Sequence, residues 1–213
     1  AGEGPVPVEQ VMMRIQRRLL AVMASVLVLS ACAIGKPTPQ AATYGLEPPP
    51  PALAATRRSQ ILRMGKVRVA PAFAGRPLVF RLDDVRYAAD FYNAFLAEPG
   101  DLMGVAVAEW LDRAGPFQSV AQPGTRTPAD LVLEATVTEL YGDFRSGRTP
   151  AAVMTIQFTL VDLRGVSTRV RLEQTIGRRI ELPEASPAAL VRGYGLALGE
   201  ILTDLAAALR RVT

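Results

Sequence analysis

Three long stretches in the second half of the chain alternate between apolar and polar residues, and each predicts a β-strand. Successive side chains of a strand point to opposite faces, so such a stretch has one apolar and one polar face. Gln174 and Arg178 interrupt the apolar face of the third stretch, and Gly165 stands where a hairpin turn is needed. The pattern predicts a meander covered on one side. The apolar faces consist of Leu131, Leu133, Ala135 and Val137; of Met154, Ile156, Phe158 and Leu160; and of Val170, Leu172, Ile176, Ile180 and Leu182.

Two further stretches repeat with the period of an α-helix. Pro99 opens the first, which extends to Ala114 and ends at Gly115-Pro116. The second is capped by Ser186, starts at Pro187 and runs toward Arg211. The apolar stripes are Met103, Val107, Trp110, Leu111 and Ala114 in the first helix, and Leu190, Tyr194, Leu198, Ile201, Leu205 and Leu209 in the second.

Shorter apolar runs at residues 67–71, 78–82, 85–93 and 117–120 predict additional strands. Together the elements predict one α+β domain. We expect a mainly antiparallel or mixed sheet of five to seven strands, with the two amphipathic helices packed on one of its faces.

The N-terminal region has the layout of a bacterial secretory leader. Three arginines at positions 14, 17 and 18 precede an apolar stretch of eleven residues, 19–29. Eleven residues are too few to cross the ~30 Å hydrocarbon core of a bilayer as a helix. The stretch closes with Leu29-Ser30-Ala31-Cys32, which resembles a lipobox, the signal for cleavage before a cysteine that is then acylated. The alternatives are an ordinary signal peptide with an incidental cysteine, and a short uncleaved anchor.

The position of Cys32 favours the lipobox, because the only cysteine in the chain occupies the one place that the motif requires. Two or more acyl chains give stable anchoring. Ala33, rather than an aspartate, follows the cysteine, and by resemblance to the sorting rule of such lipoproteins this favours the outer membrane.

These features predict four regions: an upstream extension at 1–11, a lipoprotein signal peptide at 12–31, a lipidated proline-rich tether at 32–60, and a periplasmic domain at 61–213. The prolines between residues 37 and 51 disfavour a helix or a central strand in the tether. Within it, residues 43–46 form a strand-like island that is able to pair with the domain.

Composition argues against several kinds of chemistry. The chain has no histidine and one cysteine, so histidine-dependent nucleophile systems and the commonest zinc ligand are missing. We therefore expect no enzyme activity, no metal and no cofactor, although chemistry based on carboxylates alone stays open. The net charge of +4 is too small to indicate a nucleic-acid-binding protein.

Two sets of polar or small residues allow both a functional and a structural interpretation. Asp83, Asp84 and Asp90 are the candidates for paired carboxylates, but solvated loops explain them better. The glycines at 193, 195 and 199 miss the dinucleotide-binding fingerprint in spacing and context, and close packing of the helix on the sheet is the better interpretation.

Two segments are candidates for an interface. Tyr87, Phe91, Tyr92 and Phe95 lie in a segment without clean two-residue or 3.6-residue alternation, so it cannot bury all four aromatics against one core. The second candidate is the strand face that carries Arg169 and Arg171. The alternative there is a solvated face of mixed charge, since Glu173 and Glu181 share it.

The order of several motifs resembles that of the ABC-type transport auxiliary lipoproteins, the lipoprotein partners of bacterial lipid-transport systems built around MCE-domain proteins. After the lipobox come Thr43-Tyr44-Gly45-Leu46-Glu47-Pro48-Pro49, then Lys66-Val67-Arg68-Val69-Ala70-Pro71, then Tyr92-Asn93-Ala94-Phe95-Leu96-Ala97-Glu98-Pro99 before the first helix, and Phe117-Gln118-Ser119-Val120 after it. The third segment departs from the family pattern. Phe95 is the nearest aromatic where tryptophan is common, and Leu96 intervenes before Ala97-Glu98-Pro99. The resemblance covers roughly residues 29–210.

The resemblance implies a non-enzymatic, outer-membrane-anchored periplasmic component that assists lipid or hydrophobic-solute traffic. Its expected partners are an MCE-domain protein and an ABC permease and ATPase, and self-association is also expected. A structural lipoprotein subunit of an outer-membrane secretion or assembly complex is the alternative, because it needs the same anchor and contact surface.

Overall fold

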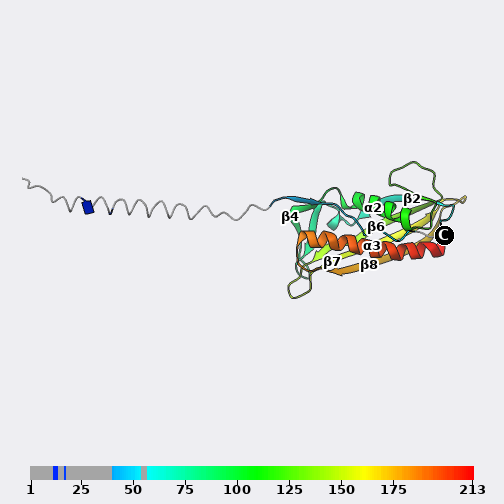
Figure 1. Cartoon of the computed structure of the whole chain (residues 1–213). Coiled ribbons are helices and arrows are strands. Elements are labelled where there is room, and N and C mark those ends of the chain that lie inside the picture. Colours follow the sequence, from blue (N-terminus) through cyan, green and yellow to red (C-terminus); the bar gives the residue numbers. More distant parts are fainter. Residues whose placement is uncertain (1–11, 14–16, 18–39, 54–56) are drawn as a thin grey trace, which may run out of the picture. The chain divides into compact units, whose positions relative to one another are not determined.

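The three long strands predicted from the alternation pair in succession as an antiparallel meander in a computed structural model of the chain, which describes residues 12–13, 17, 40–53 and 57–213. Contacts divide the chain into residues 1–40 and 41–213, and the fold below is that of the second unit. The predicted leader and Cys32 lie outside the described residues. The elements are β1 (Ala42–Tyr44), β2 (Ile61–Val69), a 3-10 turn (Pro71–Phe73), β3 (Pro77–Arg81), β4 (Tyr87–Phe95), α2 (Pro99–Ala114), β5 (Ser119–Ala121), β6 (Leu131–Asp143), β7 (Ala151–Asp162), β8 (Arg169–Glu181) and α3 (Pro187–Val212) (Figure 1).

Strand β6 organises a mixed sheet of eight strands. On one side it pairs antiparallel with β7, which pairs antiparallel with β8. On its other side the first part of β6 pairs in parallel with β2, and its last two residues pair in parallel with β3. β5 extends the sheet beyond β2, while β4 and then β1 extend it beyond β3. The predicted α+β class and mixed sheet are confirmed. The number of strands exceeds the expected five to seven, because the strand-like island predicted at residues 43–46 supplies β1.

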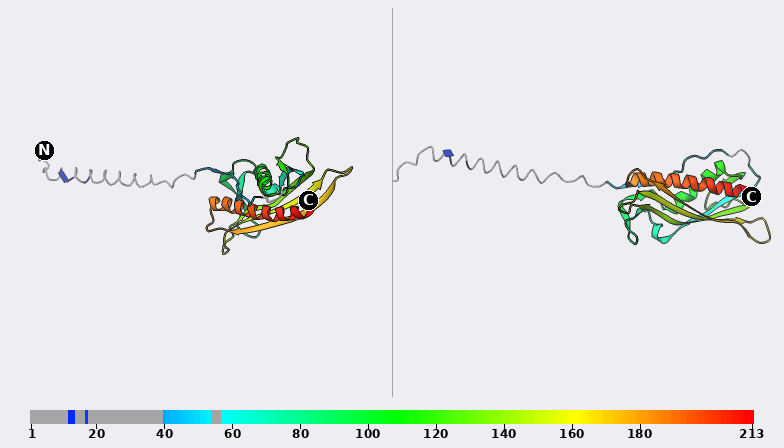
Figure 2. Two further views of the ribbon diagram at one scale, coloured as in Figure 1. Left: turned by 45° about the vertical axis from the view of Figure 1, so that its right-hand side comes forward. Right: turned by 90° about the horizontal axis from the view of Figure 1, so that it is seen from below.

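Both helices begin where the local sequence predicted. Pro99 and Pro187 each occupy the first helical turn, and the Ser186 hydroxyl oxygen accepts a hydrogen bond from the Ala189 N–H (3.2 Å). α3 packs over β7 and β8, α2 packs over β2 and β5, and the helices contact each other. Figure 2 shows α3 lying along β8 from two further directions.

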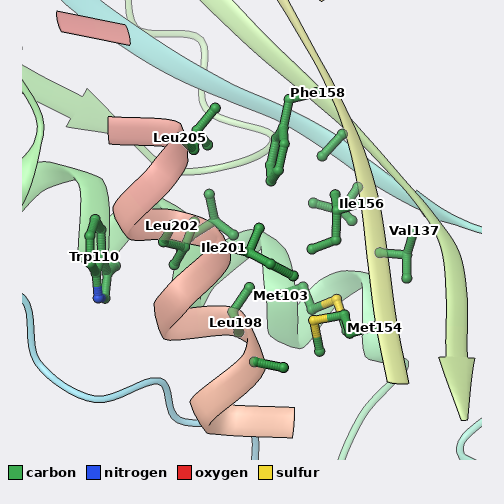
Figure 3. Packing of buried hydrophobic residues seen from close by; sticks show 14 of the residues in the cluster. Met103, Trp110, Val137, Met154, Ile156, Phe158, Leu198, Ile201, Leu202 and Leu205 are labelled. Carbon is green, nitrogen blue, oxygen red and sulfur yellow. The ribbon is translucent and has the colours of Figure 1, made fainter. Parts of the chain in front are cut away.

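The core lies between this helical layer and one face of the sheet. Side chains of α3 such as Leu198, Ile201 and Leu205 meet Met154 and Phe158 of β7, and all five are fully buried (Figure 3). Burying a side chain of this size contributes about 1.5–3 kcal/mol, so the two amphipathic stripes read from the sequence are what hold the helices to the sheet.

Gly193 allows α3 to approach the sheet, as predicted for the glycines of this helix. A Cβ at this position would lie 2.6 Å from Leu182 Cδ2 and 2.8 Å from Ala152 Cβ, which is closer than real Cβ atoms come. Gly195 and Gly199 face a different neighbour, the segment 46–53 described below.

Arg178 does not simply interrupt the apolar face of β8. Its side chain points toward α3, where its guanidinium forms ion pairs with Glu200 (Nε to Oε2, 2.9 Å) and Asp204. Arg178 therefore finds its partners on the helix that covers this strand.

Candidate interaction surfaces

The exposed aromatic residues of β4 lie on a bulge that Asp90 holds in place. The Asp90 carboxylate accepts hydrogen bonds from the backbone N–H groups of Tyr92 (2.8 Å) and Asn93 (3.0 Å) and from the Asn93 side-chain amide (2.9 Å). The pairing of β4 with β3 shifts register in this region. An inserted bulge of this kind re-aims side chains and interrupts the strand's alternation. As a result Phe91 and Tyr92, although adjacent, are both on the surface.

The two rings form a small exposed patch. Phe91 is 91% exposed and Tyr92 39% exposed, and their ring centroids are 5.1 Å apart at an interplanar angle of 80°. Edge-to-face geometry is favourable for aromatic pairs. Phe91 is the most exposed aromatic side chain among the described residues. The prediction that this segment displays aromatic residues therefore agrees with the positions of Phe91 and Tyr92.

Phe95 was wrongly included in the candidate interface. It is 2% exposed, and its ring packs 6.1 Å from that of Tyr194 on α3. Regular alternation resumes after the bulge, and this turns Phe95 toward the core. The sequence could not show this, because the residues that form the bulge have no distinctive pattern.

Tyr87 takes part in a separate aromatic cluster. It lies edge-on to Tyr141 of β6, with centroids 5.5 Å apart, and the Arg81 guanidinium lies 5.7 Å from its ring centre. Phe73 packs against both tyrosines. Tyr87 is 44% exposed, so its ring is shared between this cluster and the surface.

The chain enters the domain beside the exposed pair. Ala42 of β1 pairs in parallel with Asn93 of β4, and Tyr44 pairs with Phe95. The Tyr44 hydroxyl donates a hydrogen bond to the Asn93 side-chain oxygen (3.0 Å). Residue 41, which leads toward the N-terminus, therefore reaches the domain at the level of Tyr92.

The segment 46–53, expected to be part of the tether, packs on the helical layer instead. Leu46 is buried, and the Trp110 indole N–H donates to the Pro49 carbonyl oxygen (3.0 Å). A Cβ on Gly195 would lie 2.5 Å from the Glu47 carbonyl oxygen, and one on Gly199 would lie 2.9 Å from Pro49 Cδ. The two glycines thus leave room on α3 for this segment, and the domain begins at residue 41 rather than 61.

Two clefts flank the segment 46–53. One, of about 590 Å³, lies between it and the C-terminal half of α3, and the other, of about 630 Å³, lies between it and α2. Trp110 lines both clefts. This surface was not predicted from the sequence. The available signal was the pair Gly195 and Gly199, which are four residues apart and therefore share one helix face.

The arginine-bearing face of β8 carries less free positive charge than the sequence indicated. Arg171 lies 3.9 Å from the Asp162 carboxylate, which also binds Arg164 (2.7 Å). Arg179, on the same strand, is engaged by the buried Asp143 (2.6 Å), and a register shift against β7 between Leu172 and Val170 separates it from the start of the strand. Arg169 is exposed at the start of the strand. This leaves a face of mixed charge at an outer strand of the sheet.

The three aspartates weighed as catalytic candidates serve the backbone or the surface. Asp83 accepts hydrogen bonds from the Val85 and Arg86 N–H groups, and these bonds lower the pKa of its carboxyl group. Asp84 is exposed and binds Arg145, and Asp90 supports the bulge. A depressed pKa keeps an aspartate ionised, whereas a general acid needs a raised one.

Within the described ranges, no group of three or more cysteine, aspartate or glutamate side chains is arranged to hold a metal ion. No helix in the same ranges combines the length and hydropathy that crossing a membrane requires.

Comparison with solved structures places this architecture in a known fold class. The crystal structure of protein XCC0632 from Xanthomonas campestris, a member of family DUF330, superposes with a TM-score of 0.68 at 17% identity, covering 79% of this chain and 95% of that one. A crystal structure described only as that of an uncharacterized protein gives a TM-score of 0.63 at 15% identity, covering 82% and 99%. At such identities the likeness concerns the fold alone. A search of curated proteins gives no match.

The family is given by the sequence of the domain itself. Residues 44–206 match the model of the family described as "ABC-type transport auxiliary lipoprotein component". The match spans the domain from β1 to α3, so the chain belongs to this family. The resemblance drawn from the motif order is thereby confirmed, and the family is one of lipoprotein components auxiliary to ABC-type transport.

Proposed function

We propose that the protein is an outer-membrane lipoprotein, anchored through acylated Cys32, that serves an ABC/MCE-type lipid or hydrophobic-solute transport system without catalysing a reaction itself. The observation that carries the proposal is the match of residues 44–206 to the transport auxiliary lipoprotein family, together with the single cysteine of the chain at the end of Leu29-Ser30-Ala31-Cys32. The proposal implies that residues 12–31 are a cleaved leader and that residue 32 is acylated.

The protein acts by contact in this proposal. Its partners are an MCE-domain protein and the permease and ATPase of the same system, and copies of the chain also associate with one another. Two surfaces are available: the aromatic pair Phe91 and Tyr92 on β4, and the face of β8 that carries Arg169 and Arg171. β8 pairs only with β7, and outer strands with an unpaired edge are common sites of protein contact, which favours β8 for a protein partner.

The anchor is tested by mass spectrometry of the protein purified from its native membrane. The expected mature chain begins at an acylated Cys32, and a Cys32→Ala variant loses the lipid while the domain keeps its thermal unfolding transition. An intact leader, or a mature chain that starts at another residue, contradicts the anchor.

The transport role is tested by chemical cross-linking in native membranes, followed by identification of the linked proteins. Links from β8 to an MCE-domain protein or to the permease support the proposal. Links to subunits of a secretion channel instead assign the chain to the alternative, a structural lipoprotein of a secretion or assembly complex. An Arg169→Glu, Arg171→Glu double variant should weaken the specific links while leaving the fold intact.

A further inference from the structure

The geometry of β1 and β4 points to a role for the exposed aromatic pair: Phe91 and Tyr92 form the membrane contact of the domain, at the headgroup level of the bilayer that holds the anchor. This inference rests on the acylation of Cys32 proposed above. It goes beyond that proposal, because an acylated tether by itself does not determine which face of the domain meets the lipid.

The first argument is where the chain leaves the domain. Ala42 pairs with Asn93 in parallel register, so residue 41 comes out beside Tyr92 and the chain leads from there toward the anchor. Neighbouring strands lie about 4.8 Å apart. The aromatic pair is therefore next to the point at which the tether is attached.

The second argument is the length of the tether. Because β1 and the segment 46–53 belong to the domain, only nine residues lie between Cys32 and Ala42, which makes ten steps from one Cα atom to the next. A chain spans at most about 3.5 Å per residue, so the attachment point stays within about 35 Å of the acylated residue. A spacer continuing to residue 60 would have allowed the domain to stand much further away.

The opposite end of the sheet is less favourably placed. The turn between β7 and β8 contains the fully exposed Val166 and lies beyond Leu131, the first residue of β6. Along β6, nine residues separate Leu131 from Leu140, which is level with the bulge of β4. At about 3.3 Å per residue the separation is about 30 Å. Figure 1 shows β4 and this turn at opposite ends of the domain. Contact of Phe91 with lipid therefore needs no extension of the tether, whereas an upright domain that touches lipid at Val166 needs the tether extended by about 30 Å, nearly its full length.

The third argument is chemical. Aromatic side chains are enriched at membrane interfaces, where an apolar ring and a polar hydroxyl both find suitable surroundings. The Asp90 hydrogen bonds fix the bulge, so the rings are presented by ordered backbone rather than by a loose loop.

The same bulge argues against a second protein chain as the occupant. Strand addition needs a regular row of unpaired N–H and C=O groups, and bulges are one of the devices that protect sheet edges from it. Asp90 occupies the Tyr92 and Asn93 N–H groups, and β1 already covers residues 93–95. Backbone pairing at this place is blocked, while insertion of side chains into lipid is not.

The test uses the acylated mature lipoprotein in vesicles of phosphatidylethanolamine and phosphatidylglycerol. A Phe91→Trp variant places a fluorescent reporter at the patch. The matched control is Val166→Trp, at an equally exposed site at the far end of the sheet. Trp110, the only native tryptophan, is nearly buried, so the wild-type spectrum can be subtracted from both variants.

The emission of the tryptophan at position 91 should shift to the blue on reconstitution. Phospholipids brominated near the headgroup end of the acyl chain should quench it, and those brominated near the methyl end should quench it less. The control at position 166 should show neither effect. Tyr92→Trp serves as a second reporter, with the same expected pattern.

Failure of this inference is distinguishable from failure of the anchor. If mass spectrometry shows acylated, vesicle-bound protein and the tryptophan at position 91 behaves like the one at position 166, the membrane contact is refuted and the anchor stands. A blue shift without quenching by either lipid, growing with protein density, identifies a second copy of the chain as the occupant and also refutes it. A chain without acyl groups overturns the proposed function from which the inference starts.

Discussion

The buried carboxylate of Asp143 provides the sharpest test of how the end of the central strand is held. Its side chain has no exposed surface, and its two oxygens accept hydrogen bonds from Arg145 Nε and Nη2 (both 2.8 Å) and from Arg179 Nη1 (2.6 Å). Arg179 also donates to the Thr149 carbonyl oxygen (3.2 Å). The cluster thus ties the loop between β6 and β7 to β8, and Asp143→Asn would break it while keeping the shape of the side chain.

The expected loss of stability follows from the burial of each partner. Removing one member of a fully buried ion pair costs about 3–5 kcal/mol, because the other charge is left uncompensated. Here Arg145 is 14% exposed and Arg179 42% exposed, so water can partly solvate the remaining charges. We therefore expect a loss of about 2–3 kcal/mol in the free energy of unfolding. For a domain of this size that is a decrease of roughly 4–12 °C in Tm.

The effect should depend on pH in a defined direction. The hydrogen bonds from Arg145, and then those from Arg179, hold the pKa of Asp143 well below its ordinary value, although burial opposes them. A depressed pKa in the folded state means that the carboxylate stabilises the fold above the unfolded-state pKa of about 3.9, and that this contribution is lost as pH falls below that value. The difference in stability between wild type and Asp143→Asn should be constant near neutrality and should shrink below about pH 4.

Urea unfolding followed by circular dichroism, at pH 7 and at steps below pH 4, measures this difference. Asp84→Asn is the matched control, since Asp84 binds Arg145 (2.9 Å) from an 84% exposed position. Exposed pairs contribute about 0–1 kcal/mol. Equal stability of Asp143→Asn and Asp84→Asn at pH 7, or a difference that does not narrow in acid, would refute this account of the cluster.

Two further substitutions test the packing of the helical layer. Gly195→Val should destabilise the domain by about 1–3 kcal/mol and expose the segment 46–53 to amide exchange, because the new Cβ would meet the Glu47 carbonyl oxygen. The control is Gly45→Ala, whose Cβ would have no atom within 4 Å, and it should change neither the stability nor the exchange. Ser186→Ala removes the oxygen that caps α3 and should cost about 1 kcal/mol in urea unfolding; a neutral result would show that the backbone alone fixes this helix start.

The sequence was most informative where structure is decided locally. A proline in the first turn and a glycine or a capping serine at the boundary act within a few residues, so α2 was predicted at its observed bounds and α3 from its observed first residue. The long alternating strands were also recognisable, because one face of each meets the core. Val170 was wrongly placed on that face: it is 61% exposed, because β8 shifts register against β7 between Leu172 and Val170. The apolar stripes predicted for α2 and α3 are buried, which confirms the helical period read from the sequence.

The parts that depended on distant partners were not predictable in the same way. The tether prediction treated Pro48–Pro51 as a spacer, since prolines exclude a helix or a central strand. Proline does not exclude packing, however: the Pro49 carbonyl oxygen accepts one hydrogen bond from the Trp110 indole N–H, and the Pro49 ring finds space beside Gly199. Whether a proline-rich stretch stands free or lies on a domain is decided by the surface opposite it.

Asp90 illustrates the same limit at the level of one residue. From the sequence, Asp90 was compatible with a solvated loop or with a catalytic carboxylate, and both interpretations rest on its negative charge. In the structure it acts through its geometry. Its oxygens satisfy the N–H groups of Tyr92 and Asn93 that the register shift would otherwise leave without partners. A short acidic side chain is suited to this role because it can bond to backbone two and three residues ahead. The exposure of Phe91 and Tyr92, and the burial of Phe95 three residues later, are both consequences of that local choice, so the surface proposed to meet the membrane depends on a residue that does not itself need to touch lipid.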